Sequence, residues 1–509
     1  MKIFKYIFFT AIAAVMASCS LEEDRVSVTD PDNYFRNFTE CQSVLNGCYM
    51  PMNTACNANF FVVTEGVSDL MYLGGSNMQD AYLDFSPATP RYGATAWQQG
   101  YLGVSRCNYA VWGVENAPDG ALTDDQRVQL LCEAKALRGF YYLYLTNMFG
   151  DVPFYFDPIR TMEDQDRVGR LGRMPAVQTR DTLIADLQKI APYAAQTRTS
   201  DNKGARAGAA LAYMIIAKCA MWNAAQTEDD EYWDIALDAI ASLESIYGDF
   251  SQYDYKENVL FRNKNTPESI LEVQHAYRQG GISYISNLAG RCMPTPLVVT
   301  DGKPYYDGVL IEELGTNANP NTVIRPNKAF VETQTKGGKD IRAHVNMAWG
   351  YGGKEFKNVT DIKPFMGPKF WCPDIQVNSD GNNYKLYRYA DAILMKAECL
   401  CETEDYQGAL KYLNMTRKRA GLDEYRDATP GALMEEIRTE RARELFGEFQ
   451  RKFDLVRWGV FYETVMEKND YATLKKNLKP CHRYYPIPDS EVAKSKYILD
   501  NKEYEQYGF

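Results

Sequence analysis

The segment Leu386-Tyr-Arg-Tyr-Ala-Asp-Ala-Ile-Leu-Met-Lys-Ala-Glu398 lies near the start of the stretch that decides the fold, residues 384–459, and Arg451-Lys-Phe-Asp-Leu-Val-Arg-Trp-Gly459 ends it. In its last part, apolar side chains recur at multiples of four residues and then after three: Leu433, Ile437, Leu445, Phe449, Phe453 and Val456. This spacing predicts one amphipathic helix. Arg441 interrupts its apolar face. A guanidinium is costly to bury alone, so we expect a carboxylate partner, either Glu444 or Asp391.

The opposite face of this predicted helix carries charged side chains. They form three pairs of opposite charge, each spaced three residues apart: Glu440/Arg443, Glu448/Arg451 and Asp454/Arg457. Such a pair contributes about 0.2–0.5 kcal/mol on a helix surface. We expect this face to be solvated or to pack against a partner helix.

Two further helices are indicated upstream by small and apolar side chains. One face of the first carries Tyr387, Ala390, Leu394, Ala397 and Cys401, and one face of the second carries Ala409, Tyr412, Leu413, Thr416 and Ala420. Small residues at these spacings let helices approach closely, as in stacked hairpins of the tetratricopeptide type. The sequence therefore predicts a mainly α fold of tetratricopeptide-like helical hairpins with a large loop-rich insertion.

Helical and irregular segments alternate along the rest of the chain. Helices are expected at residues 35–50, 97–115, 124–148, 178–195, 206–225 and 231–247, and a strand at 268–274. Residues 276–383 hold thirteen of the 35 glycines and eight of the 22 prolines. Long loops that keep their aromatic residues are usually functional. We expect residues 53–96 and 276–383 to form a ligand region, beside helical repeats at 97–270 and 384–462.

The N-terminus has the pattern of a secretory signal. Lys2 and Lys5 precede an apolar run over residues 7–17, which is too short to span a bilayer. The order Met16-Ala17-Ser18-Cys19 resembles a bacterial lipobox. We therefore expect a signal peptide over residues 1–18, lipidation of Cys19 and a tether over residues 19–32. An ordinary cleaved signal with an unmodified Cys19 is the alternative.

Charge and cysteine content limit the partners and the covalent structure. The chain has 67 acidic and 56 basic residues, a formal net charge of −11 and no evident basic stripe. This disfavours nucleic acid and anionic lipid as partners, whereas an uncharged or weakly basic ligand fits. Eleven cysteines remain besides Cys19. One or two disulfides are compatible with export, above all among Cys41, Cys48 and Cys56, and their connectivity is open.

Several sequence blocks are similar to the SusD/RagB family of Bacteroidota surface lipoproteins. They are the two segments quoted first, with Leu413-Asn-Met-Thr-Arg-Lys-Arg-Ala-Gly-Leu422 and Glu440-Arg441 between them. Glu133-Ala-Lys-Ala-Leu-Arg-Gly-Phe-Tyr-Tyr-Leu-Tyr-Leu145, Phe149-Gly-Asp-Val-Pro153 and Tyr484-Tyr-Pro-Ile-Pro488 also resemble family segments. Glu22-Glu23-Asp24 resembles the surface-export tag of Bacteroidota lipoproteins, whereas Asp500-Asn-Lys-Glu-Tyr504 departs from the usual ending of the SusD/RagB family. The resemblance implies one SusD-like domain over residues 33–509.

The same resemblance implies a role. Proteins of this family bind glycans on a shallow face of loops and cover a SusC-like TonB-dependent transporter in the cell outer membrane, where a lipid anchors them. We therefore expect the repeat helices to face the transporter and the loops to face an oligosaccharide or polysaccharide, without catalysis. A peptide-capturing RagB-like lipoprotein, a surface glycosidase and a plain helical scaffold are the alternatives.

Common enzyme motifs are missing from the sequence. His275, His344 and His482 are isolated, so no His-x-x-x-His pattern can hold zinc. There is no Gly-x-Ser-x-Gly turn and no Gly-x-x-x-x-Gly-Lys-Ser/Thr loop. We expect no cofactor, no metal and no catalytic residue. Paired carboxylates for glycoside cleavage stay open, because their separation in space is invisible in a sequence.

Candidate ligand contacts are aromatic and amide side chains of the predicted ligand region, because sugars present apolar C–H faces and hydroxyl edges. For each aromatic residue, pinning its own loop is the alternative role. The candidates are Tyr72, Tyr92, Tyr284, Asn287, Tyr305, Trp349, Tyr351 and Trp371.

Overall fold

The structure, a computed structural model, describes residues 34–74, 78–279, 282–334, 338–356 and 364–509. The expected signal peptide, Cys19 and the tether over residues 19–32 lie outside these ranges. Among the helices described, none combines the length and the apolar character needed to pass through a bilayer.

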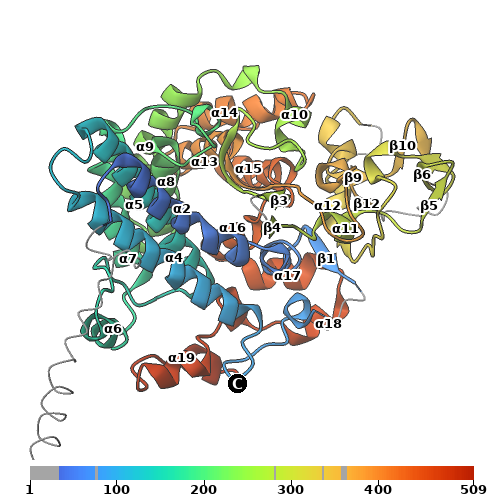
Figure 1. The fold of residues 1–509 in the computed structure, drawn as a ribbon. Coiled ribbons are helices and arrows are strands. Elements are labelled where there is room, and N and C mark those ends of the chain that lie inside the picture. Colours follow the sequence, from blue (N-terminus) through green and yellow to red (C-terminus); the bar gives the residue numbers. More distant parts are fainter. Residues whose placement is uncertain (1–33, 75–77, 280–281, 335–337, 357–363) are drawn as a thin grey trace, which may run out of the picture.

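A body of paired helices forms the left part of the molecule in Figure 1. Its longer helices are α2 (Phe38–Ala55), α4 (Tyr92–Glu115), α5 (Asp124–Phe149), α7 (Ala176–Gln188), α8 (Ala209–Thr227), α9 (Glu231–Tyr247), α13 (Tyr389–Glu402), α14 (Tyr406–Arg419) and α15 (Pro430–Glu444). Successive helices pack on each other, α4 on α5, α7 on α8, α8 on α9 and α13 on α14. The predicted mainly α fold of helical hairpins is confirmed.

Shorter elements complete the helical part. They are α3 (Ala58–Thr64), η2 (Gln79–Tyr82), α6 (Met162–Val168), α10 (Tyr255–Val259), α11 (Ala289–Cys292), α12 (Lys328–Glu332), α16 (Arg451–Arg457), α17 (Phe461–Lys468), α18 (Ala472–Asn477), α19 (Asp489–Lys494) and α20 (Lys502–Glu505). The helix α8 shows how the body is held together. Its residues from Ala209 to Ala224 are buried apart from Lys218, and α5, α7 and α9 pack around it. A helix that is apolar on all sides is stable only when enclosed in this way.

Residues 276–383 form the right-hand part of the molecule in Figure 1 and contain short strands and turns. The strands of the described chain are β1 (Met71–Leu73), β2 (Ser269–Val273), β3 (Ala276–Gln279), β4 (Ile282–Tyr284), β5 (Leu297–Thr300), β6 (Lys303–Tyr306), β7 (Val309–Leu310), β8 (Ile324–Pro326), β9 (Met347–Ala348), β10 (Gly350–Tyr351), β11 (Lys354–Glu355), β12 (Phe365–Met366) and β13 (Tyr384–Arg388), and β3 to β12 belong to this region. β2 precedes this region, β13 follows it, and the two pair antiparallel. The ends of the region are therefore held side by side against the helical body.

The prediction of one helix running through to Val456 is wrong. The structure divides this stretch into α15 and α16, with a turn over residues 445–450. Gly447 has φ 72° and Phe449 has φ 64°, and a right-handed helix contains neither value. The turn brings the Phe449 ring into the core, where it stacks on Phe60 with ring centroids 5.5 Å apart. Burial of this ring offsets the loss of helical hydrogen bonds.

The charged face of α15 and α16 is buried. Of the two alternatives given for it, contact with solvent is wrong and packing inside the protein is right. Five of its residues are at most 9% exposed: Glu440, Glu448, Arg451, Asp454 and Arg457. Their partners come largely from distant segments. Arg451 pairs with Asp69 at 2.7 Å, and Arg457 pairs with Glu398 at 2.6 Å. Spacing along a helix could not reveal these partners.

Arg441 is buried and has carboxylate partners, as its position in the apolar stripe predicts. Asp391, one of the two expected partners, lies 3.0 Å from Nη1. The second carboxylate is Asp454, 2.9 Å from Nη2. Glu444, the other expected partner, binds Arg388 instead, at 2.7 Å.

A cluster of ion pairs surrounds Glu444 in the interior. We call it the central ion cluster, and its side chains are at most 7% exposed: Glu268, Glu440, Glu444, Glu448, Arg342, Lys369, Arg388 and Arg419. These segments are far apart in the sequence, so the cluster joins the two ends of the loop region to α14 and α15. Buried charges require this dense pairing, because each loses its hydration.

Acid should destabilise the fold through this cluster. Burial alone would raise the pKa of Glu444, but Arg419, Arg388 and Arg342 together outweigh it and lower that pKa to about 2. In the unfolded chain the group titrates near 4.5. Its contribution to stability is therefore complete above pH 4.5 and is lost as the pH falls toward 2. We expect urea titrations to show a falling free energy of unfolding over this interval, and a constant value there would contradict the lowered pKa.

The eleven cysteines within the described ranges are all buried and free, so none of the disulfides that the sequence left open, above all among Cys41, Cys48 and Cys56, is formed there. Cys41 and Cys48 lie on the buried face of α2. Seven residues along a helix separate Cα atoms by about 10 Å. A disulfide needs about 4.4–6.8 Å, so these two thiols cannot meet.

Candidate ligand-binding site

Three of the predicted ligand contacts are buried and take part in packing. Trp371 is 0% exposed, and its Nε1 donates to the carbonyl oxygen of Met366 at 3.0 Å. Trp349 is 5% exposed. Tyr92 is 4% exposed, and its hydroxyl shares a hydrogen bond of 2.9 Å with that of Tyr144. Because these rings hold their own surroundings in place, we remove them from the set of ligand contacts.

The other five candidates reach the surface in separate places: Tyr72, Tyr284, Asn287, Tyr305 and Tyr351. Tyr305 on β6 and Tyr351 on β10 lie toward the outer end of the loop region, far to the right in Figure 1. Tyr72 on β1 and Tyr284 on β4 lie nearer the helical body. The structure therefore does not gather the predicted residues into one patch.

Tyr72 belongs to a cluster of three half-exposed tyrosines, which we call the tyrosine cluster. The Tyr72 and Tyr471 rings stack with centroids 6.2 Å apart, and the Tyr82 ring lies 5.9 Å from that of Tyr471. β1, η2 and the residue before α18 supply the three rings. The sequence analysis missed Tyr471, because it lies beyond the last predicted helix in a segment without periodicity.

Arg325 lies beside this cluster. It is directly opposite Tyr72 in the antiparallel pair of β1 with β8, so the two side chains share one face. The half-buried guanidinium is 3.7 Å from the centroid of the Phe365 ring, and burial lowers the pKa of Arg325. Within the described ranges it forms no ion pair with a carboxylate. Burial raises the pKa of Tyr72, and Asp470 raises it further, so the Tyr72 hydroxyl keeps its proton at neutral pH.

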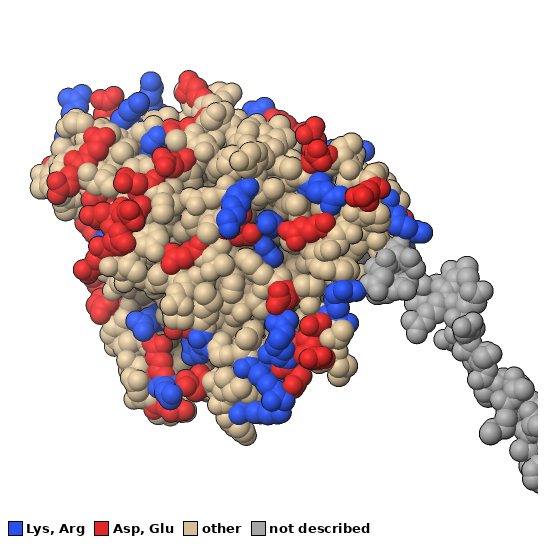
Figure 2. Space-filling view, turned by 90° about the vertical axis from the view of Figure 1, so that its left-hand side faces the viewer, with Lys and Arg blue, Asp and Glu red and all other residues tan. Residues whose placement is uncertain are grey.

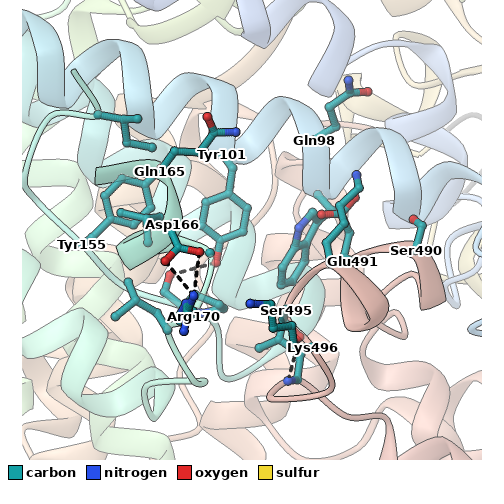
Figure 3. Close-up of a pocket in the computed structure, with 18 of the residues that line it drawn as sticks. Gln98, Tyr101, Tyr155, Gln165, Asp166, Arg170, Ser490, Glu491, Ser495 and Lys496 are labelled. Atoms are coloured by element: carbon teal, nitrogen blue, oxygen red, sulfur yellow. Dashed lines mark hydrogen bonds and ion pairs between the residues drawn. The ribbon is translucent and has the colours of Figure 1, made fainter. Parts of the chain in front are cut away.

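A groove of about 850 Å³ lies between α4, α6 and α19 (Figure 3). Trp97, Tyr101 and Tyr155 line one side, but their rings are already packed on one another. The Tyr101 ring lies 4.9 Å from that of Trp97, and its hydroxyl donates to the carbonyl oxygen of Pro153 at 2.8 Å. None of the predicted ligand contacts lines this groove. The rest of its lining is partly polar and includes Gln98, Asp166 and Lys496.

A smaller cavity of about 440 Å³ lies between α2 and the β3–β4 hairpin, and we call it the β3–β4 pocket. Tyr284, one of the predicted ligand contacts, lines it. The other walls include Asn46, Met50 and Asn53 from α2, Glu272 from β2, and Gln274 and His275 from the chain between β2 and β3. With Tyr49 also in its lining, this concave site combines two tyrosine rings with amide groups, which is a composition typical of small-molecule sites.

The helical side of the protein carries charges of both signs. Figure 2 shows Asp and Glu side chains interspersed with Lys and Arg over that face. An exposed acidic run at residues 228–231 joins α8 to α9. This face therefore lacks the positive track that binding to a phosphate backbone requires. In the described ranges, no three His, Cys, Asp or Glu side chains are arranged to hold a metal ion.

Comparison with known proteins shows similarity along the whole chain. A model of the SusD family matches residues 365–504, which include α13 to α19. SusD-like protein P25 from Formosa agariphila is 23% identical over 547 residues, which cover 98% of each chain. A SusD-like protein from Bacteroides ovatus is 25% identical over 384 residues, covering 71% of this chain and 65% of its own.

Solved structures show the same fold. A surface glycan-binding protein A from Bacteroides thetaiotaomicron, in complex with laminarihexaose, is 21% identical and has a TM-score of 0.69, covering 91% of this chain and 98% of its own. A SusD superfamily protein from Bacteroides vulgatus has a TM-score of 0.71 at 20% identity over similar lengths. The family model, the relatives and the shared fold agree with the sequence blocks identified first, and together they support a SusD/RagB family protein.

Proposed function

We propose that this protein is a surface lipoprotein that captures oligosaccharides and delivers them to an outer-membrane transporter, without converting them. The similarity to the SusD/RagB family supports this role. So does the fold shared with surface glycan-binding protein A, which has been solved with laminarihexaose. The lipid on Cys19 and a SusC-like TonB-dependent partner are parts of the same proposal.

The observation that carries the ligand proposal is the tyrosine cluster beside Arg325. Half-exposed rings offer apolar faces to the C–H side of a sugar, and a guanidinium donates hydrogen bonds to its oxygens. Mutual stacking of Tyr72 and Tyr471 sets the ring positions before a ligand arrives, so binding costs little side-chain entropy. A shallow site of this kind also releases its ligand readily, as delivery to a transporter requires.

Replacing Tyr72 and Tyr471 together with alanine should weaken glycan binding by about tenfold or more. Loss of aromatic anchors of an interface typically costs about 2 kcal/mol, and each 1.4 kcal/mol is a tenfold change in affinity. Calorimetric titration with laminarihexaose and a panel of soluble plant and host polysaccharides would measure the effect. Tyr193→Ala is the matched control, because Tyr193 is 75% exposed and belongs to neither the cluster nor the two cavities described above.

Three outcomes of these titrations would contradict the proposal. Unchanged affinity in the double variant would remove the tyrosine cluster as the ligand site. Binding of a peptide mixture and of no glycan would indicate peptide capture instead. Appearance of shorter sugars during incubation would indicate a glycosidase. Co-purification of a TonB-dependent transporter with the tagged protein from outer membranes is the corresponding test of the partner.

A further inference from the structure

Arg325 is a cation that the protein leaves without a carboxylate. Its side chain is half-buried, and burial lowers the pKa of Arg325, because the charged form loses hydration. A guanidinium nevertheless keeps its charge at neutral pH. The buried Arg441 and Arg451 have carboxylate partners, Asp454 at 2.9 Å and Asp69 at 2.7 Å. Within the described ranges Arg325 has no such partner, and a half-buried charge without one calls for an explanation.

The guanidinium of Arg325 is held in place by aromatic rings. Its Cζ lies 3.7 Å from the centroid of the Phe365 ring, which is buried and packs on the Tyr306 ring with centroids 5.2 Å apart. Such a contact uses the flat face of the guanidinium, whereas its N–H groups point outward in the plane of the group. No described residue accepts a hydrogen bond from these N–H groups, and their nitrogen atoms are not sealed from solvent. A ligand at the surface can therefore reach them.

A second arginine borders the tyrosine cluster. Arg291 belongs to α11, which packs on β8, the strand that carries Arg325. Its Nη1 lies 3.1 Å from Sδ of Met78, the residue before η2, and η2 supplies Tyr82 to the cluster. Arg291 is half-buried as well, and burial lowers the pKa of Arg291. It forms no ion pair with any carboxylate in the described part of the chain. Two arginines from packed elements thus border the cluster.

Two exposed acidic side chains lie close to the cluster rings in the sequence, but both are engaged with other groups. Asp470 accepts a hydrogen bond from the backbone N–H of Lys328 at 2.7 Å, and Asp84 lies 3.9 Å from Arg91. The net charge of −11 disfavours an acidic ligand at long range, but salt screens it beyond about 8 Å at physiological ionic strength. At contact distance, the unpaired guanidinium of Arg325 therefore decides which charge the site favours.

We propose that the tyrosine cluster and Arg325 together select acidic sugars, which carry a carboxylate or a sulfate group. Tyr72 and Tyr471 hold the C–H face of the ring, and the N–H groups of Arg325 bind the anionic substituent. The planar fork of a guanidinium matches two oxygens of such a group, and hydrogen bonds between ions are about twice as strong as neutral ones. Arg291 adds a second positive charge at the border of the site. The inference rests on the proposed function and names the class of glycan that is captured.

Pairs of ligands that differ in charge test this preference. Hexagalacturonate and its methyl ester share the same sugar rings, as do dextran sulfate and dextran. In calorimetric titrations at low salt, we expect the charged member of at least one pair to bind more tightly by about tenfold or more, because charge-assisted hydrogen bonds form only with that member. Added sodium chloride should reduce the difference. The first pair reports on a carboxylate and the second on a sulfate.

Arg325→Gln should abolish the preference. Glutamine keeps a polar side chain beside Phe365 but has no charge, so the charged ligand should bind no more tightly than its uncharged partner. The melting temperature should not fall, because no ion pair is lost. Arg325→Lys keeps the charge without the planar fork and should keep part of the preference. Arg426→Gln is the matched control, since it removes the same charge from a side chain that is 86% exposed, between α14 and α15, and it should leave the preference unchanged.

Two kinds of result would overturn the inference while the proposed function stands. One is equal affinity of the intact protein for both members of each pair, or binding of neutral laminarihexaose alone. The other is a preference for the charged member that survives in Arg325→Gln. In either case, weaker glycan binding after replacement of Tyr72 and Tyr471 would still support capture at the cluster. If the intact protein bound no glycan, charged or neutral, the proposed function itself would fail.

Discussion

Arg388→Met should lower the free energy of unfolding by about 3–5 kcal/mol, the cost of breaking a buried ion pair from one side. Its Nη1 lies 2.7 Å from both Glu268 and Glu444, and its Nε lies 2.8 Å from Glu448. All four side chains are at most 2% exposed. Methionine fills much of the space but supplies no charge, so three buried carboxylates lose a cation that they share. Urea titration of both proteins at neutral pH would measure the difference.

An exposed ion pair provides the control for this substitution. Lys339 and Asp423 approach to 2.9 Å, but both are well exposed to solvent. Lys339→Met removes the same formal charge and should leave the stability nearly unchanged, because water screens such pairs. A loss below about 1 kcal/mol for Arg388→Met would show that the remaining cations of the central ion cluster compensate, and would contradict the role assigned to Arg388.

Gly447→Ala should lower the free energy of unfolding by about 2–4 kcal/mol. Two effects add. At φ 72° the backbone is in the left-handed region, where a side chain costs about 1–2 kcal/mol. A Cβ at this position would also lie 2.5 Å from Cζ of Phe370 and 3.3 Å from Cε2 of Phe61, and overpacking a core costs about 1–3 kcal/mol. Thermal and urea unfolding would measure the combined effect.

Gly120→Ala separates the two effects. Gly120 has φ 79°, but a Cβ there would meet nothing within 4 Å. Its substitution therefore carries the backbone cost without the clash and should destabilise less than Gly447→Ala. Equal losses in the two variants would show that the core around Phe370 relaxes, and that packing at the turn between α15 and α16 is looser than the structure indicates.

The helices of the body were predictable because their signals are local. The helix expected at 231–247 is α9 without any shift, and that expected at 124–148 differs from α5 by one residue. Both end at a glycine with positive φ, Gly150 and Gly248, and Thr123 forms a capping box at the start of α5. Periodicity and caps act within a few residues, so they can be recognised without knowledge of the fold.

The turn at Gly447 was not predictable from the same signals. The apolar spacing from Leu433 to Val456 is compatible with one helix, and it continues across the turn because both halves face the same core. The helix is interrupted because the turn buries the Phe449 ring against Phe60, which stabilises the fold. Phe60 is almost 400 positions away in the sequence. Local spacing carries no information about that contact.

The binding residues show the same division. Trp349 and Trp371 are of the residue type expected of sugar contacts, yet their rings are buried and pack inside the protein. Tyr471 stacks on Tyr72 although nothing near it in the sequence marks it as functional. Only the positions of β1 and α18 in the fold decide that these two rings share a surface.

The sequence by itself determined the resemblance to the SusD/RagB family, the helical hairpins and the need for a carboxylate beside Arg441, because motif order, periodicity and the cost of burying a charge are properties of the chain. The tertiary structure alone decided which rings reach solvent and which carboxylates share a cation. Burial and pairing depend on segments that are distant in sequence, and their approach is set by the packing of the whole core.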